Sequence, residues 1–167
     1  MNRRAFLNLP LAAGAMAAAK HPNVVILLAD DLGWADLGCY GGEIETPNLD
    51  RLAGQGVRFE QFCAFPVCSP TRSALLTGRS PMRLGIAYTV IRPWSNYGLP
   101  LGEHLLPETF QAAGYQTAIT GKWHLGHSLV KYLPHNRGFD HAYGQLNGAI
   151  DYYTHTREGG LDWQRNG

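Results

Sequence analysis

The stretch Asn23-Val24-Val25-Ile26-Leu27-Leu28-Ala29-Asp30-Asp31 decides the fold expected for this chain. It is a continuous apolar run, rich in β-branched residues, that ends at two aspartates. Such a run is typical of a strand buried on both faces, as in a parallel sheet covered by helices. We therefore expect an α/β layered fold with a mostly parallel or mixed sheet.

Helices and strands are expected to alternate along the rest of the chain. Helices are predicted at residues 47–53, 69–78 and 106–114, and strands at residues 23–29, 57–62 and 115–120. From Leu125 onward the sequence is rich in Gly, His, Tyr and Asn and shows no clear period. In sheets of this kind ligands bind beyond the carboxyl ends of the strands, where Asp30-Asp31 and Lys122-Trp123-His124 fall.

The composition is that of one ordinary globular domain. The chain has 167 residues, of which 45% are hydrophobic and 16% are charged, and this argues against disorder. The formal net charge of +1 gives no electrostatic reason to expect nucleic acid or a membrane surface as a partner.

Residues 1–19 are expected to form an export signal. Arg3 and Arg4 precede an apolar run at residues 6–19 that ends in Ala-x-Ala cleavage patterns, and the paired arginines resemble a twin-arginine signal. The run is shorter than the roughly 20 residues that span a bilayer, so no stable membrane insertion is expected. We therefore assign the domain to residues 20–167 and expect a periplasmic or secreted protein. A mispredicted or disordered start is the alternative.

Asp30 and Asp31 place two carboxylates directly after the first predicted strand. Hard divalent cations prefer oxygen ligands, so the pair is a candidate metal site. No His or Cys lies beside it, which favours calcium or magnesium over zinc. The alternative is that one aspartate caps the turn at Leu32-Gly33 and the other is solvated.

The stretch Cys68-Ser69-Pro70-Thr71-Arg72 is more specific. Proline two residues after the cysteine places Cys68 at or just before a helix N-terminus, where free N–H groups and the helix dipole favour an anion. Arg72, one turn later, can direct its guanidinium to the same place. These residues predict a site for a tetrahedral oxyanion beside a sulfur nucleophile. A capped helix with an incidental buried cysteine is the alternative.

Gly121-Lys122-Trp123-His124-Leu125-Gly126 follows the last predicted strand. Lys122 would supply a fixed positive charge and His124 a proton carrier, if both reach one pocket. A surface lysine beside a packed Trp-His pair is the alternative.

Together these stretches resemble the sulfatase family. Cys68 to Arg72 fits the Cys-x-Pro-x-Arg pattern that formylglycine-generating enzymes recognise, and Gly121 to Gly126 is similar to the family's second signature. The resemblance implies an alkaline-phosphatase-like fold, and hydrolysis of sulfate esters by a formylglycine made from Cys68, whose hydrated aldehyde attacks sulfur. It implies catalytic roles for Cys68, Arg72, Lys122 and His124, substrate binding by Arg72, Lys122 and His124, and a Ca²⁺ or Mg²⁺ ion held by Asp30, Asp31 and residue 68.

The similarity runs from about Asn23 to His155 and points to the arylsulfatase B type. The segments 28–34, 137–140 and 151–155 carry this closer match. It implies a sulfated carbohydrate or aryl sulfate as substrate, such as N-acetylgalactosamine 4-sulfate, and a formylglycine-generating enzyme as partner. Because loops set specificity within one fold, the substrate rests on family analogy.

The three cysteines of the chain leave one question open. If Cys68 is converted, Cys39 and Cys63 remain as a pair. A disulfide between them and two buried, reduced thiols are both open, because disulfide geometry is not visible in a sequence.

Length is where the chain departs from the family. Members run several hundred residues further, and the resemblance implies that the remaining metal ligands, an Asp followed by an Asn, lie there with a further histidine and lysine. We therefore expect an N-terminal portion of a sulfatase domain, whose incomplete sheet exposes apolar surface and aggregates. The alternatives are a phosphonate or phosphate ester hydrolase of the same superfamily and an inactive truncated fragment.

Overall fold

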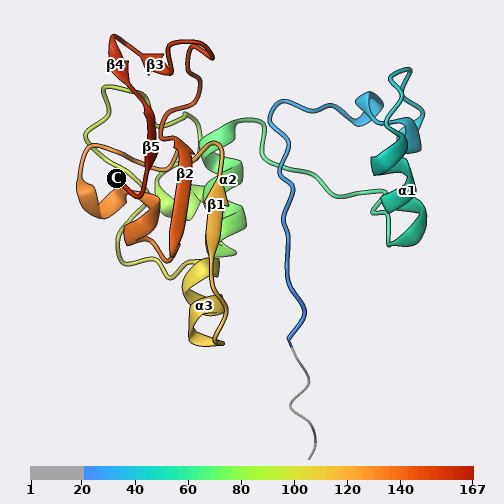
Figure 1. The fold of residues 1–167 in the computed structure, drawn as a ribbon, viewed down its shortest axis with the longest axis horizontal. Coiled ribbons are helices and arrows are strands. Elements are labelled where there is room, and N and C mark those ends of the chain that lie inside the picture. The colour runs from blue at the N-terminus through green and yellow to red at the C-terminus, as the bar shows by residue number, and fades with distance from the viewer. Residues whose placement is uncertain (1–20) are drawn as a thin grey trace, which may run out of the picture.

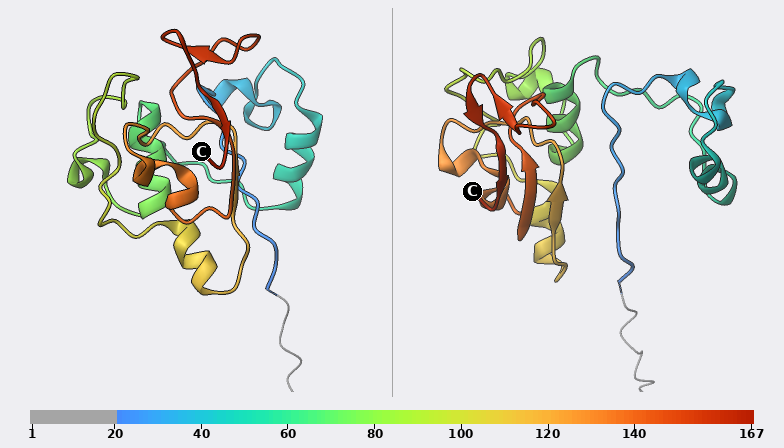
Figure 2. Two further views of the ribbon diagram at one scale, coloured as in Figure 1. Left: turned by 60° about the vertical axis from the view of Figure 1, so that its left-hand side comes forward. Right: turned by 45° about the horizontal axis from the view of Figure 1, so that its top comes forward.

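The computed structural model describes residues 21–167, so the predicted signal at residues 1–19 lies outside the described residues. This part of the chain forms a small sheet with helices beside it and, set apart from the sheet, a lobe that carries the first helix (Figures 1 and 2). The helices are α1 (Pro47–Gln55), α2 (Cys68–Thr77) and α3 (Leu106–Ala112). The strands are β1 (Ala118–Thr120), β2 (His141–Gln145), β3 (Thr156–Arg157), β4 (Gly160–Leu161) and β5 (Trp163–Arg165).

The sheet is mixed, with the strand order β1-β2-β5 (Figure 1). Strands β1 and β2 run parallel, with Ile119 opposite Ala142, whereas β2 and β5 run antiparallel. Strands β3 and β4 form a separate antiparallel hairpin. The predicted α/β class with a mixed sheet is confirmed, and the strand predicted at residues 115–120 is confirmed over its second half.

All three predicted helices are confirmed. Helix α2 begins at Cys68, directly after the extended residue Val67, and ends at Gly78, whose φ of 65° is left-handed. Glycine is favoured there because that conformation costs other residues about 1 kcal/mol. At the start of α3 a carboxylate oxygen of Glu108 accepts a hydrogen bond from the backbone N–H of Leu105 at 2.5 Å.

The strands predicted at residues 23–29 and 57–62 are wrong, because neither segment joins a sheet. Residues 23–29 are extended, but they lie apart from the edge strand β1 and do not pair with it (Figure 1). An apolar, β-branched run reports only which side chains avoid water. A strand also requires a neighbour that accepts and donates its backbone hydrogen bonds, and the described residues supply none for either segment.

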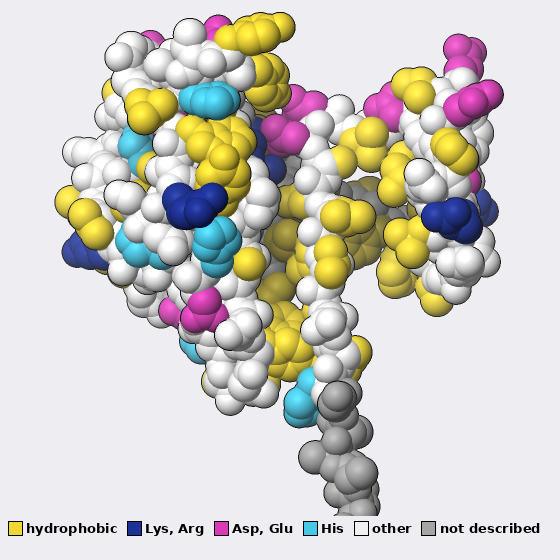
Figure 3. Space-filling model, viewed as in Figure 1, with side chains coloured by type: hydrophobic (Ala, Val, Ile, Leu, Met, Phe, Trp, Pro, Cys, Tyr) yellow, Lys and Arg dark blue, Asp and Glu magenta, His cyan; other side chains and the backbone are white. Residues whose placement is uncertain are grey.

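The extended segment is instead attached near its two ends. The hydroxyl of Tyr115 donates a hydrogen bond to the carbonyl of Pro22 at 3.0 Å, and Asp30 forms an ion pair with Lys122. Between these points the apolar side chains stay uncovered, with Val25 79% exposed. Apolar atoms accordingly line the gap between the sheet and the lobe of α1 (Figure 3). The expected exposure of apolar surface is therefore observed, whereas aggregation stays a prediction.

The buried core is built mostly from loops around α3 and β1. It consists of Leu84, Ile86, Ile91, Leu99, Leu105, Trp123, Leu125 and Phe139. The Trp123 and Phe139 rings pack edge to face with their centroids 6.1 Å apart. Trp123 and Leu125 flank His124 in the sequence, so the core packing also positions that histidine.

The cysteines of the described chain are unpaired. Cys39, Cys63 and Cys68 are all free thiols, and Cys63 is exposed. Of the described residues, none belongs to a helix long and apolar enough to cross a membrane.

Candidate active site

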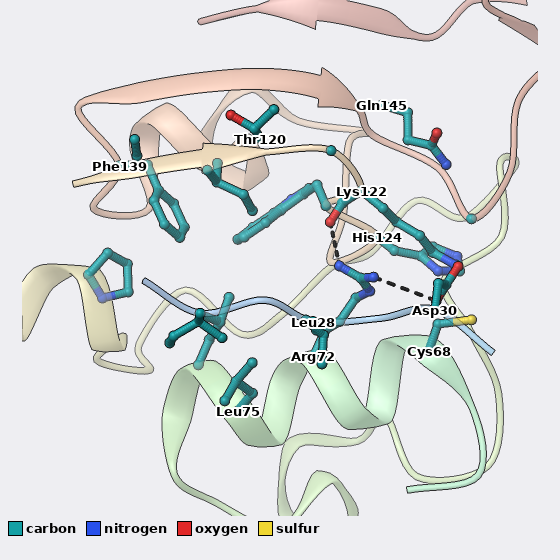
Figure 4. Close-up of a pocket in the computed structure, with 18 of the residues that line it drawn as sticks. Leu28, Asp30, Cys68, Arg72, Leu75, Thr120, Lys122, His124, Phe139 and Gln145 are labelled. Carbon is teal, nitrogen blue, oxygen red and sulfur yellow. Dashed lines mark hydrogen bonds and ion pairs between the residues drawn. The ribbon is translucent and has the colours of Figure 1, made fainter. Parts of the chain in front are cut away.

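A cavity of about 780 Å³ lies between the extended segment, helix α2 and strand β1 (Figure 4). Its inner part is apolar, with Leu28, Leu75 and Phe139 among the residues that line it. Its other end is polar. All six residues singled out from the sequence line this one cavity, namely Asp30, Asp31, Cys68, Arg72, Lys122 and His124. The fold therefore gathers them, although their roles stay predictions.

Cys68 stands at the first position of α2 and is a half-buried free thiol. The next residue, Ser69, is fully buried and holds this end of the helix in place. Its hydroxyl donates to the carbonyl of His124 at 2.8 Å and accepts from the backbone N–H of Ile91 at 3.1 Å. Ser69 therefore joins the helix start to the two loops that complete the polar end of the cavity.

Arg72 lies one turn after Cys68, and its side chain is only 11% exposed. One terminal nitrogen donates to the carbonyl of Lys122, and the other lies 3.6 Å from a carboxylate oxygen of Asp30. Its Nε is buried without a partner among the described residues. A guanidinium with an unused donor in a cavity can bind an oxyanion.

Lys122 forms the shortest ion pair of the site, with its Nζ 2.7 Å from Oδ2 of Asp30. Figure 4 shows both side chains at the polar end of the cavity, beside Cys68. Burial acts to raise the pKa of Asp30, but the hydrogen bond from Lys122 and the charges of Lys122 and Arg72 together hold it below its ordinary value of 3.8. Asp30 is therefore a carboxylate at neutral pH.

His124 is buried, at 4% exposed, in a left-handed backbone conformation with φ 58°. Its Nε2 lies 2.9 Å from the carbonyl oxygen of Ile91. A carbonyl only accepts, so Nε2 carries the proton and Nδ1 carries a lone pair. Nδ1 is buried and has no partner in the described structure. Burial lowers the pKa of His124 to about 4, and the charge of Lys122 acts in the same direction.

The donors for a metal are of the right kind but too few. Asp31, which also adopts a left-handed conformation with φ 57°, lines the cavity beside Asp30 and Cys68. Carboxylates suit a hard cation such as Ca²⁺ or Mg²⁺. Within residues 21–167, however, no three His, Cys, Asp or Glu side chains are grouped so as to hold a metal ion. Both oxygens of Asp30 also already face cations.

The sequence did not indicate three residues that shape the site. Ser69 and Ile91 position α2 and His124 as described above, and Gly148 leaves room for the His124 ring. A Cβ at position 148 would lie 2.5 Å from Cε1 of His124. Ser69 lies inside a stretch that the sequence did single out, but Ile91 and Gly148 are ordinary loop residues there, and only the folded chain brings them to His124.

Comparison with known proteins gives a consistent family. The sulfatase family model matches residues 22–164. N-acetylgalactosamine-6-sulfatase of Rattus norvegicus is 49% identical over 146 residues, which cover 82% of this chain and 27% of that protein. Arylsulfatase A of Bos taurus is 50% identical over 141 residues, which cover 83% of this chain and 28% of that protein. The chain thus spans less than a third of the length of these relatives.

A solved structure agrees with these matches. Ps i-CgsB in complex with k-i-k-neocarrahexaose superposes with a TM-score of 0.71 at 37% identity, over 77% of this chain and 29% of that chain. The alkaline-phosphatase-like fold class implied by the sequence is thereby confirmed. The closer similarity to the arylsulfatase B type stays a prediction.

Proposed function

The chain belongs to the sulfatase family, and on that premise we propose that it carries the nucleophile and the sulfate-binding cations for hydrolysis of sulfate esters of sugars. One observation supports this most: Cys68, Arg72, Lys122 and His124 come from two distant segments of the chain and line one cavity. A helix start, two largely buried cations and a neutral histidine are the groups that transfer of a sulfuryl group needs.

Arg72 and Lys122 bind the sulfate in this proposal. Their side chains are 11% and 10% exposed, so little water screens them. They share one carboxylate, that of Asp30. Positive charge therefore remains for the sulfuryl oxygens, on which negative charge grows as the ester bond breaks.

Residue 68, converted to formylglycine, would supply a hydroxyl of the hydrated aldehyde as nucleophile, and a divalent metal on Asp30, Asp31 and residue 68 would supply positive charge beside it. We favour Ca²⁺ for the metal, with Mg²⁺ as the second choice, because the donors are hard oxygens. Since residues 21–167 provide too few donors, the remaining ligands would have to come from outside the described residues.

A role for His124 as the proton acceptor in the cavity belongs to the same proposal. Its Nε2–H is held by the carbonyl of Ile91, which leaves the Nδ1 lone pair free. Its pKa of about 4 keeps the ring neutral at neutral pH, so Nδ1 is available as an acceptor. We propose that Nδ1 receives the hydroxyl proton of residue 68 when sulfate is released.

For the substrate we propose a sulfated N-acetylgalactosamine or a related sulfated sugar. The sequence resemblance supports the 4-sulfate, and a relative named N-acetylgalactosamine-6-sulfatase supports the 6-sulfate as a second candidate. The proposed partner is a formylglycine-generating enzyme, which would recognise Cys68 to Arg72. Residues 1–19 would direct export of the chain, either to the periplasm or out of the cell.

The test is sulfate release, measured by ion chromatography on the chain co-expressed with a formylglycine-generating enzyme and supplied with Ca²⁺. The substrates are N-acetylgalactosamine 4-sulfate, its 6-sulfate, 4-nitrophenyl sulfate and a phenylphosphonate ester. We expect release from the sulfates, complete loss in Cys68→Ala, and full retention in Cys63→Ala, which removes an exposed thiol outside the cavity. Turnover by Cys68→Ala, or faster cleavage of the phosphonate, would refute the proposal.

Mass spectrometry of the peptide that contains Cys68 provides a second readout. Conversion of the thiol to an aldehyde changes the mass of this peptide, whereas the peptide with Cys63 should keep its thiol. An unmodified Cys68 in an active preparation would contradict the proposed nucleophile.

A further inference from the structure

The wall of the cavity carries two arginines that the proposed chemistry does not use. The charged residues that line it are Asp30, Asp31, Arg72, Arg92, Lys122 and Arg157. Arg72 and Lys122 are engaged with Asp30. Arg92 and Arg157 are both exposed, and Arg157 pairs only with the adjacent Glu158, so cations outnumber carboxylates among the residues that line the cavity.

Arg92 is held close to the reacting groups by its neighbour in the chain. Ile91 is tied both to Ser69 at the start of α2 and to the ring of His124. The backbone N–H of Arg92 itself donates to the hydroxyl of Ser95 at 2.9 Å, which closes a tight turn. Its guanidinium makes no ion pair or hydrogen bond with another described residue. The backbone is therefore fixed, while the charge is unengaged.

Arg157 reaches the same cavity from the hairpin of β3 and β4. Its only ion pair within residues 21–167 is with the adjacent residue Glu158, at 3.4 Å, and its side chain is 38% exposed. Asp151 accepts hydrogen bonds from the N–H groups of Tyr153 and Thr154, and this turn presents Tyr152, which is 83% exposed and also lines the cavity. An exposed aromatic ring and a cation that line the same cavity suit a sugar that carries an anionic group.

We propose that Arg92 and Arg157 supply a second anion site in the wall of the cavity, which binds a further sulfate or carboxylate on the same oligosaccharide. This inference rests on the proposed function, since Arg72 and Lys122 hold the sulfate that is removed. The preferred substrate is then a polyanionic oligosaccharide rather than a singly sulfated monosaccharide or an aryl sulfate. The second anion raises affinity because one molecule satisfies both pairs of cations at once.

The test compares probes that differ in the number of anionic groups. Dissociation constants are measured by calorimetry for N-acetylgalactosamine 4-sulfate, for the chondroitin 4-sulfate disaccharide, whose second sugar carries a carboxylate, and for a disulfated carrageenan disaccharide, which is built on galactose and carries two sulfates. Arg92→Gln and Arg157→Gln are compared with Arg83→Gln, an exposed arginine that does not line the cavity.

We expect the wild-type chain to bind at least one disaccharide more tightly than the monosaccharide. Each cavity arginine, when changed, should weaken binding of that disaccharide about three- to tenfold and leave the monosaccharide within about twofold, as fits partly exposed charge pairs. Arg83→Gln should change neither. The disaccharide that responds identifies the second group as carboxylate or sulfate.

Binding separates this inference from the proposed function. The expected affinity pattern in a chain that releases no sulfate would support the second anion site and refute the proposed hydrolysis. Equal losses for all three probes, no loss for either disaccharide, or no binding of any probe would overturn the second anion site, whatever the chain hydrolyses.

Discussion

Two substitutions that remove the same ion pair should have unequal costs in the free energy of unfolding. Lys122 Nζ lies 2.7 Å from Asp30, and Arg72 lies 3.6 Å from the other oxygen of the same carboxylate. The Asp30 side chain is 43% exposed, whereas those of Lys122 and Arg72 are 10% and 11% exposed. Asp30→Asn therefore leaves two largely buried cations without their carboxylate. Lys122→Met leaves a carboxylate that water reaches and that still faces Arg72.

The magnitudes follow from this asymmetry. An uncompensated buried charge costs about 3–5 kcal/mol, and loss of an exposed partner costs about 0–1 kcal/mol. Because Asp30 is partly solvated, we reduce the first figure and expect about 2 kcal/mol for Asp30→Asn. For Lys122→Met, which keeps the apolar stem of the side chain, we expect about 1 kcal/mol or less.

Urea unfolding of dilute protein, followed by tryptophan fluorescence, measures both costs. Trp123 is 2% exposed and reports the core, whereas Trp34 and Trp94 are 51% and 73% exposed and should change little. Glu45→Gln removes an exposed carboxylate and serves as control, with an expected change within about 0.5 kcal/mol. If Lys122→Met costs as much as Asp30→Asn or more, the burial argument fails.

Three further outcomes are expected. Gly148→Ala should lower sulfate release at least about tenfold, because its Cβ would lie 2.5 Å from the His124 ring. Gly54→Ala, where nothing lies within 4 Å of the added Cβ, should leave sulfate release unchanged. Equal activities of the two variants would contradict this. His124 binds a proton near pH 6.5 in the unfolded chain but only near pH 4 in the folded chain. Urea titrations should therefore show the free energy of unfolding decreasing as the pH is lowered from 6.5 to 4. The loss should reach about 3 kcal/mol at the lower pH. If the same dependence of unfolding free energy on pH persists in His124→Gln, groups other than His124 cause it. Leu125→Ala removes a fully buried side chain and should cost about 2–5 kcal/mol in the same assay; a cost below about 1 kcal/mol would mean the core closes over the gap.

The candidate residues on each segment could be recognised from the sequence because their spacing is local. Cys68 and Arg72 stand one helical turn apart on α2, and Lys122 and His124 follow the end of β1 directly. The later strands could not be predicted from hydrophobic alternation in the sequence, for a physical reason. In β2 the buried positions are Ala142 and Gly144, whereas the larger Tyr143 is 38% exposed, so apolar size does not alternate with burial.

The sequence by itself determined the three helices and indicated the candidate reactive groups. A helix closes its hydrogen bonds within four residues, so a proline at its start and a glycine at its end decide its limits locally. The family pattern likewise depends on residue type and short spacing, and it indicated the same six cavity residues that the structure brings together.

Only the tertiary structure decided what surrounds those groups. Residues 23–29 have the composition of a buried strand, yet they remain uncovered because no described strand pairs with them. The Lys122–Asp30 ion pair joins residues 92 positions apart, and the tautomer of His124 depends on the distant carbonyl of Ile91. Strand pairing, desolvation and charge are set by neighbours in space, and those neighbours exist only once the chain has folded.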